Sequence, residues 1–393
     1  MESPLNSFIQ SPNATPDFHI AVHSVIECAR AAGFSDLITE CKHGENFSVN
    51  LTASGKSYQL TVDDSDSSQY SIVIHDQKSQ LIGSITTLFS QSKDIVRLTN
   101  NTQFEWDFSP SEYDVTKTEN YLAWLLVSLS LDFTLEDSAL ISRSAQHVSC
   151  ETWPSDIRYF PRLRKNELTT IPRKKTQCFG LYPVVDSIEL IEELATCGVK
   201  ILQLRVKDKP ESEVEDDVRR AIQVGKETGV DIVINDYWGL ALEHSASCIH
   251  LGQEDLAALE DSRILDSDIG LGISTHGYFE IINALQYKPS YLALGHIFPT
   301  TTKDMPSSPQ GLIKLKLYQS LIVSIGKQRG SVLPSVAIGG IDLERAPLVI
   351  ETGVTSVAVV RAVTLADDKK EAVDQFQRLF STEALSHGVN HAH

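Results

Sequence analysis

Short apolar segments that alternate with helical patterns dominate the second half of the chain and constrain its fold more than any other feature. Eight such segments occur, at residues 179–185, 199–204, 231–234, 247–251, 269–273, 291–294, 335–338 and 356–360. Amphipathic patterns lie between them, for example at 188–196 and 211–228, and Gly198 and Gly229 close two of these patterns. Short buried strands alternating with helices indicate parallel βαβ units. Eight units within residues 179–393 favour an α/β fold, the (β/α)8 or TIM barrel, over an open sheet.

The N-terminal part of the chain has a different pattern. Apolar residues recur at every second position in 47–51, 58–62 and 70–74, and turn-forming sequences separate these segments. This alternation predicts an antiparallel meander. A helix is expected before it, over 18–32, and a second helical region after it, over 119–145. Together these patterns predict a smaller α+β domain, in which no catalytic constellation stands out and whose function the sequence does not reveal.

A basic, proline-punctuated stretch separates the two patterns, at residues 159–175. We interpret residues 171–178 as a linker between an α+β domain at 1–170 and a barrel at 179–393. Alternatively, this basic stretch could bind a polyanion. A run of charged residues is more often a solvated linker, which is the interpretation we prefer.

The chain is acidic, with 34 Lys and Arg against 52 Asp and Glu and a net charge of −18. This charge disfavours a general affinity for nucleic acid or an anionic membrane, so an anionic ligand needs a local cluster of cations. The longest uncharged apolar stretch, 121–131, has 11 residues, whereas about 20 are needed to cross a bilayer. The N-terminus lacks the order of a secretory signal, and the six cysteines form no Cys-x-x-Cys pair. We therefore expect a cytoplasmic protein.

Chemistry in a (β/α)8 barrel is carried by the carboxyl ends of its strands. The second predicted strand ends in Gln203, Arg205 and Lys207, so one amide and two cations leave the strand together. These residues are typical of a site for an anionic substrate. A solvated strand end is an alternative that the residues alone leave open.

Carboxylates follow the third and fourth strands. Asn235 and Asp236 end the third, and Asp255 follows the fourth. Two carboxylates on neighbouring strand ends suit Mg²⁺, which usually takes one or two of them and leaves its other positions to water and substrate phosphates. The alternative is that Asp236 and Asp255 are helix N-caps, since each precedes a helical pattern.

Hydroxyl groups and glycines follow the remaining strands. The set comprises Ser274 with His276 after the fifth strand, Thr300, Thr302 and Lys303 after the sixth, Gly340 after the seventh, and Val360 with Arg361 after the eighth. Glycine lets backbone N–H groups approach an anion, and the loops after strands seven and eight are where this fold often binds phosphate. We predict a monophosphate site there. The structural alternatives are a packed histidine, a turn begun by proline, and glycines required by barrel packing.

Six short motifs occur in a fixed order on successive strand ends. They are QLRVK at 203–207, ND at 235–236, HLGQED at 250–255, GISTH at 272–276, FPTTTK at 298–303 and AIGGI at 337–341. Their order and spacing resemble the thiamine-phosphate synthase family over residues 179–382. The resemblance implies a transferase of thiamine biosynthesis that joins 4-amino-2-methyl-5-pyrimidinylmethyl diphosphate to thiazole phosphate. Its products are thiamine monophosphate and pyrophosphate, with CO₂ lost when the thiazole is carboxylated.

The resemblance also implies a role for each site residue. The pyrimidine diphosphate is held by Gln203, Arg205, Lys207, Asn235, Ser274 and Lys303, of which Arg205, Lys207, Ser274 and Lys303 form the catalytic set. Asp236 and Asp255 bind Mg²⁺. The thiazole phosphate is held by Thr300, Thr302, Gly340, Val360 and Arg361. This chain departs from the family at Arg361, where serine is common; the guanidinium either clamps the phosphate or displaces it, and clamping is the expectation.

Two other functions remain as alternatives. A thiazole tautomerase of the same family has no need of the diphosphate and metal groups. The argument against it is that this chain retains Arg205, Lys207, Asp236, Asp255 and Lys303. A non-catalytic sensor of thiamine phosphate is the second. The expected partners are small phosphorylated substrates, and the sequence leaves the oligomeric state open, a homo-oligomer included.

Overall fold

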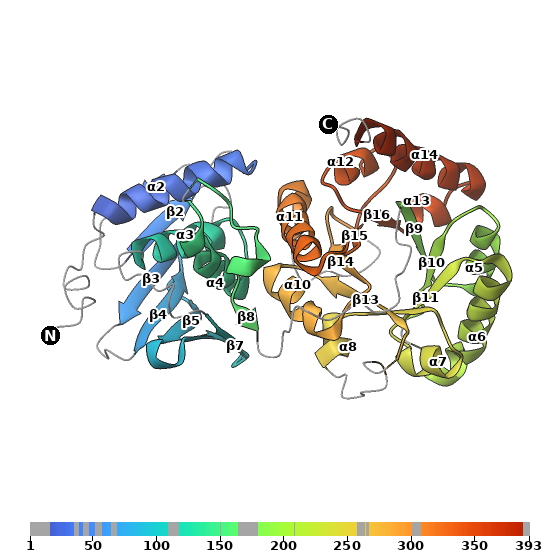
Figure 1. Cartoon of the computed structure of the whole chain (residues 1–393), viewed down its shortest axis with the longest axis horizontal. Coiled ribbons are helices and arrows are strands. Elements are labelled where there is room, and N and C mark those ends of the chain that lie inside the picture. The colour runs from blue at the N-terminus through green and yellow to red at the C-terminus, as the bar shows by residue number, and fades with distance from the viewer. Residues whose placement is uncertain are drawn as a thin grey trace. The chain divides into compact units, whose positions relative to one another are not determined.

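The computed structural model describes residues 16–34, 39–41, 47–51, 57–63, 69–108, 118–149, 151–163, 180–207, 209–257, 264, 267–300 and 308–387. The chain divides into two compact units (Figure 1). Unit 1 comprises Met1–Asn166 together with Gly277–Asn283, and unit 2 comprises Glu167–His276 and Ala284–His393. The predicted linker at 171–178 lies outside the described residues.

Unit 2 is built on a closed barrel of eight parallel strands. In chain order these are β9 (Gly180–Val185), β10 (Ile201–Leu204), β11 (Asp231–Asn235), β12 (Cys248–Leu251), β13 (Gly270–Thr275), β14 (Tyr291–Gly295), β15 (Ser335–Ile338) and β16 (Ser356–Val359). Each strand pairs with the next, and β16 pairs with β9 through Ser356 and Gly180 to close the barrel. The prediction of a (β/α)8 barrel is confirmed, with each strand within two residues of its expected ends.

The barrel core explains why its strands carry apolar residues on both faces. All four residues of β10, β12 and β16 are buried, because one face points into the barrel and the other is covered by helices. Tyr182, Val233, Tyr291 and Val336 belong to one core cluster. Gly272 makes room for the Tyr291 ring, since a Cβ atom there would lie 2.0 Å from Cζ of Tyr291.

Helices follow the strands of unit 2. They are α5 (Ile188–Ala195), α6 (Glu211–Thr228), α7 (Trp238–Glu243), α8 (Gln253–Ala257), α11 (Gly311–Arg329), α12 (Ala346–Ile350), α13 (Arg361–Thr364) and α14 (Lys369–His387). In α6, Val214, Val218 and Ala221 lie on the buried face at helical spacing. The helix ends at Gly229, whose φ of 76° suits glycine and whose N–H donates to the Gly225 carbonyl.

Unit 1 contains an antiparallel sheet of eight strands in sequential order. They are β1 (Thr39–Cys41), β2 (Phe47–Leu51), β3 (Ser57–Asp63), β4 (Gln69–Asp76), β5 (Leu81–Leu88), β6 (Lys93–Leu98), β7 (Gln103–Asp107) and β8 (Arg162–Leu163). The meander predicted at 47–51, 58–62 and 70–74 forms β2, β3 and β4. The smaller α+β domain is thus confirmed, although its sheet has further strands that alternation did not reveal.

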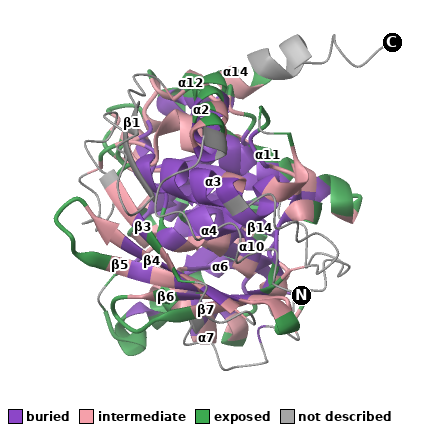
Figure 2. Ribbon diagram, turned by 90° about the vertical axis from the view of Figure 1, so that its left-hand side faces the viewer, coloured by how far each residue is buried: buried purple, intermediate pink, exposed green. Residues whose placement is uncertain are grey.

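The helices of unit 1 are α2 (Pro16–Ala31), α3 (Thr118–Ser130) and α4 (Leu135–Ser144). Figure 2 shows α3 and α4 buried along most of their length. Arg143 of α4 pairs with Asp94 of β6 through two hydrogen bonds of 2.7 and 2.9 Å. Thr87 and Trp106 donate to the same carboxylate at 2.7 and 3.0 Å, so the buried ion pair has several compensating hydrogen bonds.

Residues 277–283, which the sequence pattern assigned to the barrel, group with unit 1. They contain most of helix α10 (Tyr278–Ala284), which follows β13 in the chain. Asp137 accepts a hydrogen bond of 2.7 Å from the Phe279 N–H. Trp153 donates one of 2.9 Å to the Tyr278 hydroxyl, and the Phe160 ring stacks on Tyr278 at 5.5 Å. Within the described residues, every helix is too short or too polar to cross a bilayer.

Candidate active site

A cavity of about 580 Å³ lies at the carboxyl ends of the barrel strands. Among the residues predicted from sequence, it is lined by Gln203, Arg205, Asn235, Ser274, Thr300, Gly340, Val360 and Arg361. These residues come from six different strand ends and converge only because the barrel closes. Such convergence at the carboxyl end is where this fold places chemistry.

Two more predicted residues, Lys207 and Asp236, line a second hollow of about 440 Å³ together with Tyr237. Asp236 interacts electrostatically with Arg205, which lines the main cavity. Thr302 and Lys303 lie outside the described residues.

Asp236 and Asp255 form a carboxylate pair after β11 and β12. Partial burial, and then the neighbouring charge of Asp255, raise the pKa of Asp236 to about 6, against the opposing charges of Arg205 and Lys207. The Gly252 N–H donates to Asp255 at 3.1 Å. Asp236 does not cap α7, whose N-cap is Tyr237. A carboxyl group that is costly to ionise beside a second carboxylate suits a hard divalent cation, so Asp236 and Asp255 fit Mg²⁺.

A line of hydrogen bonds crosses the barrel interior beneath the cavity. Gln203 Nε2 donates to the Tyr182 hydroxyl at 2.9 Å, which lies 2.8 Å from the Tyr291 hydroxyl. Tyr291 lies 2.9 Å from Nδ1 of His250, and Nε2 of His250 lies 2.9 Å from Oγ of Ser274. Burial, reinforced by Arg205, lowers the pKa of His250 to about 4, so the imidazole is neutral at pH 7.

Sequence reasoning did not identify Tyr182, Tyr291 or His250 as site residues. The two tyrosines read as large apolar residues of barrel strands. The available signal was their polar tip, because a buried tyrosine hydroxyl usually has a hydrogen-bond partner.

The glycines after β15 are required by close backbone approach. Gly339 and Gly340 have φ values of 106° and 64°, and a Cβ atom on Gly340 would lie 2.6 Å from the Pro299 carbonyl oxygen. Arg345 also lines the cavity and was not predicted. Its Nη1 donates to the Gly340 carbonyl at 2.7 Å, so this loop carries a cation beside the predicted phosphate site.

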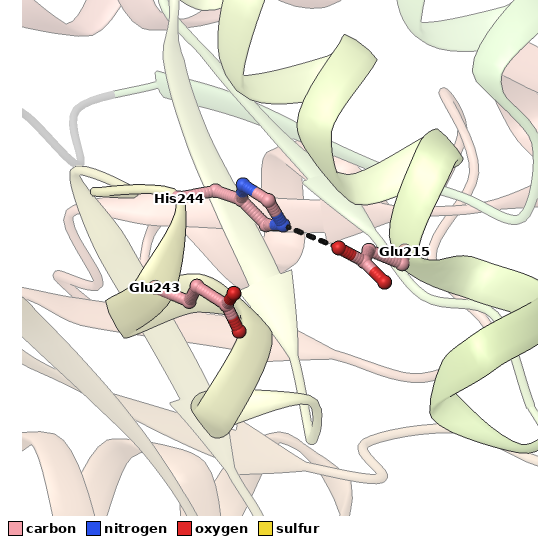
Figure 3. Close-up of side chains that lie close together, drawn as sticks. All are labelled: Glu215, Glu243 and His244. Carbon is pink, nitrogen blue, oxygen red and sulfur yellow. Dashed lines mark hydrogen bonds and ion pairs between the residues drawn. The ribbon is translucent and has the colours of Figure 1, made fainter.

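A different group, Glu215, Glu243 and His244, offers metal-ligand atoms within 4.8 Å of one another (Figure 3). Glu215 lies on α6, and Glu243 and His244 lie at the C-terminal end of α7. Nε2 of His244 lies 3.2 Å from Oε1 of Glu215. This contact joins two neighbouring helices, and the group takes no part in the cavity.

A closed parallel barrel with cations, carboxylates and glycine loops at its carboxyl end defines an enzyme of the TIM-barrel class. Comparison with known proteins narrows this class. The sequence model of the thiamine monophosphate synthase family matches residues 181–363. Two thiamine-phosphate synthases, from Klebsiella pneumoniae and Citrobacter koseri, are 52% and 53% identical over 200 and 196 residues. These alignments cover 51% and 50% of this chain, and 91% and 89% of the relatives.

The chain belongs to the thiamine-phosphate synthase family, as the six motifs predicted. Among solved structures, a thiamine phosphate pyrophosphorylase from Pyrococcus furiosus is 26% identical with a TM-score of 0.44. That match covers 52% of this chain and 96% of the other.

Proposed function

We propose that unit 2 joins 4-amino-2-methyl-5-pyrimidinylmethyl diphosphate to thiazole phosphate, or to its carboxylated form, and so produces thiamine monophosphate and pyrophosphate. Relatives about 50% identical over nearly their whole length support thiamine phosphate formation by a transferase. The observation that carries the proposal is the cavity itself, which brings Arg205 and Ser274 together with Gly340 and Arg361. One end then serves a diphosphate and the other a monophosphate.

We assign the pyrimidine diphosphate to Gln203, Arg205, Lys207, Asn235, Ser274 and Lys303. Asp236 and Asp255 would hold Mg²⁺ there, and the raised pKa of Asp236 supports this assignment because a cation would offset the charge of its neighbour. When bound, Mg²⁺ supplies positive charge that stabilises the departing pyrophosphate. Arg205 and Lys207 bear fixed positive charge at the same strand end and act in the same direction.

The reaction needs no protein nucleophile. The bond between the methylene carbon and the diphosphate oxygen breaks, and both electrons leave with pyrophosphate. The electron-rich aminopyrimidine carries the resulting methylene cation, and the thiazole nitrogen donates its lone pair to that carbon. With the carboxylated thiazole, the bond between the ring and the carboxylate carbon breaks, CO₂ leaves, and the electron pair that stays on the thiazole takes up a proton. The residues of the cavity therefore act by holding both rings and by stabilising charge on the leaving group.

We assign the thiazole phosphate to Thr300, Thr302, Gly340, Val360 and Arg361. The positive φ of Gly340 and its close approach to the loop after β14 support a site lined by backbone. We add Arg345 to this set, because it lines the cavity and is anchored on the Gly340 carbonyl.

The test is a reaction of the full-length protein with both substrates and MgCl₂. We expect thiamine monophosphate and pyrophosphate to form in equal amounts. Isomerisation of the thiazole carboxylate phosphate without pyrophosphate release would favour the tautomerase. Binding of thiamine monophosphate without any turnover would favour the sensor.

We further propose that the protein acts in the cytoplasm. The buried thiols Cys28, Cys197 and Cys248 support a reducing compartment.

A further inference from the structure

Five side chains form an unbroken line of hydrogen bonds that joins two residues of the cavity lining. The line runs from Gln203 through Tyr182, Tyr291 and His250 to Ser274, with every step between 2.8 and 2.9 Å. Gln203 and Ser274 both line the cavity, whereas the two tyrosines are fully buried between them. We call this line the barrel relay.

The barrel relay has a direction. Nε2 of Gln203 can only donate, so the Tyr182 oxygen accepts. Either tyrosine hydroxyl can donate in the next bond. In the direction that continues from Gln203, Tyr182 donates to Tyr291 and Tyr291 donates to Nδ1 of His250. A neutral imidazole that accepts at Nδ1 carries its proton on Nε2, which donates to Ser274. In this direction Gln203 presents its carbonyl oxygen, an acceptor, to the cavity, and Ser274 presents its hydroxyl proton, a donor.

We propose that the barrel relay makes the cavity selective for an aminopyrimidine over the corresponding oxopyrimidine. This inference rests on the proposed function. An aminopyrimidine offers an N–H donor beside a ring nitrogen with a lone pair, which matches the acceptor of Gln203 and the donor of Ser274. An oxopyrimidine offers the reverse pattern, a carbonyl oxygen beside a ring N–H.

An oxopyrimidine could be satisfied only if the Gln203 amide turned over and every proton along the line moved to the other partner. Tyr182, Tyr291 and His250 hold the direction and so act as positioning residues for Gln203 and Ser274. A polar group left facing the wrong partner in a buried site costs about tenfold or more in affinity.

Packing lets the relay be interrupted without disturbing the barrel. The Tyr291 ring lies over Gly272 and stacks with the His250 ring at 5.7 Å and 22°. It meets the Tyr182 ring edge-on at 5.9 Å. Tyr291→Phe keeps these ring contacts and removes only the central hydroxyl. Tyr318→Phe, on α11, is the matched control, because it removes another buried tyrosine hydroxyl of unit 2.

The kinetic test compares kcat/KM for the 4-amino substrate and its 4-oxo analogue in the full-length protein. In Tyr291→Phe we expect the preference for the amino substrate to fall about tenfold, while the KM for thiazole phosphate stays the same. Tyr182→Phe should behave alike, and the double variant should lose little more than either single one, because both interrupt one line. Tyr318→Phe should retain the full preference. An unchanged preference in both Tyr291→Phe and Tyr182→Phe would overturn the proposal.

A second measurement is independent of turnover. In protein labelled with ¹⁵N-histidine, we expect His250 to carry its proton on Nε2, with Nδ1 unprotonated. The His250→Gln spectrum identifies its signals, and Tyr291→Phe should allow the other tautomer to appear. A proton on Nδ1 in the unsubstituted protein would overturn the relay direction. If that protein releases no pyrophosphate, the proposed function fails, and the tautomer of His250 still decides for or against the relay.

Discussion

Asp236 combines a left-handed backbone conformation, with φ of 64°, and a second carboxylate as its neighbour. Asp236→Asn removes one charge from the site that fits Mg²⁺. We expect the Mg²⁺ concentration for half-maximal activity to rise roughly tenfold or more, while circular dichroism remains native. Asp255→Asn should act in the same way. Asp217→Asn, on α6, is the control.

If activity at limiting Mg²⁺ is unchanged in both variants, the metal assignment is wrong. Asp255, which accepts from the Gly252 N–H, would then be a turn residue of α8.

Arg361 is the residue at which this chain departs from its family, and it lines the cavity as the first residue of α13. Arg361→Ser should raise the KM for thiazole phosphate about tenfold, because a charge-assisted hydrogen bond is lost. The KM for the pyrimidine diphosphate should stay the same. Arg378→Ser, an exposed arginine of α14 paired with Glu371, should change neither. A KM for thiazole phosphate that stays constant or falls would show that the guanidinium does not clamp the phosphate.

At the scale of elements, α4 fixes the start of α10 through one carboxyl group. Burial raises the pKa of Asp137 to about 7, although the Phe279 N–H opposes this shift and the charge of Glu136 adds to it. The folded state therefore holds this proton more tightly than the unfolded state does. The protonated carboxyl group of Asp137 therefore stabilises the folded state. This stabilisation is fully present below about pH 4 and is lost as the pH rises through about 7.

Asp137→Asn should remove this pH dependence. Between pH 4 and 8 the unsubstituted protein should lose up to about 4 kcal/mol of unfolding free energy relative to the variant. Urea unfolding followed by tryptophan fluorescence reports mainly on unit 1, which contains Trp106, Trp124 and Trp153. Asp107→Asn, an exposed residue of β7, is the control. A stability difference that is constant across this pH range would show that Asp137 is ionised throughout.

At the scale of the whole molecule, unit 1 is an addition to the catalytic barrel. Alignments with the relatives cover about nine-tenths of their length but only half of this chain. We therefore expect the fragment 167–393 to retain synthase activity per folded molecule. Its thermal midpoint should be lower than that of the full chain, because Tyr278 and Phe279 lose their contacts with Trp153, Phe160 and Phe104 within unit 1.

A fragment that also carries Tyr278→Thr and Phe279→Thr should aggregate less, since it exposes less apolar surface. Thermal unfolding and pyrophosphate release, measured on both fragments and the full chain, test this expectation. A folded but inactive fragment 167–393 would show that unit 1 contributes to catalysis.

Local sequence patterns predicted the strands in which the burial of side chains follows one regular pattern from end to end. The barrel strands carry mostly apolar residues on both faces, and β4 alternates buried and half-buried residues. The strand β6 escaped prediction because Asp94 occupies one of its buried positions. A charge there breaks the apolar alternation, and only its pairing with Arg143, 49 residues away, makes it tolerable.

The residues of the candidate site also fall into two groups, those that the sequence predicted and those that it did not. Gln203, Arg205, Asn235 and Ser274 were predictable because each ends a strand, and the barrel fold places all such ends around one cavity. Tyr182 and Tyr291 were not, since they are 109 residues apart and meet only across the closed barrel. Arg345 escaped because its anchor, the Gly340 carbonyl, is set by a glycine loop.

The sequence by itself determined a (β/α)8 barrel with a smaller α+β domain before it, and the strand ends that line its cavity. Period and spacing are local properties, and they suffice for elements that bury themselves in a regular way. Only the tertiary structure decided that residues 277–283 belong with unit 1. Their partners Asp137, Trp153 and Phe160 lie more than a hundred residues earlier, and such long-range contacts leave no periodic signal in the segment they hold.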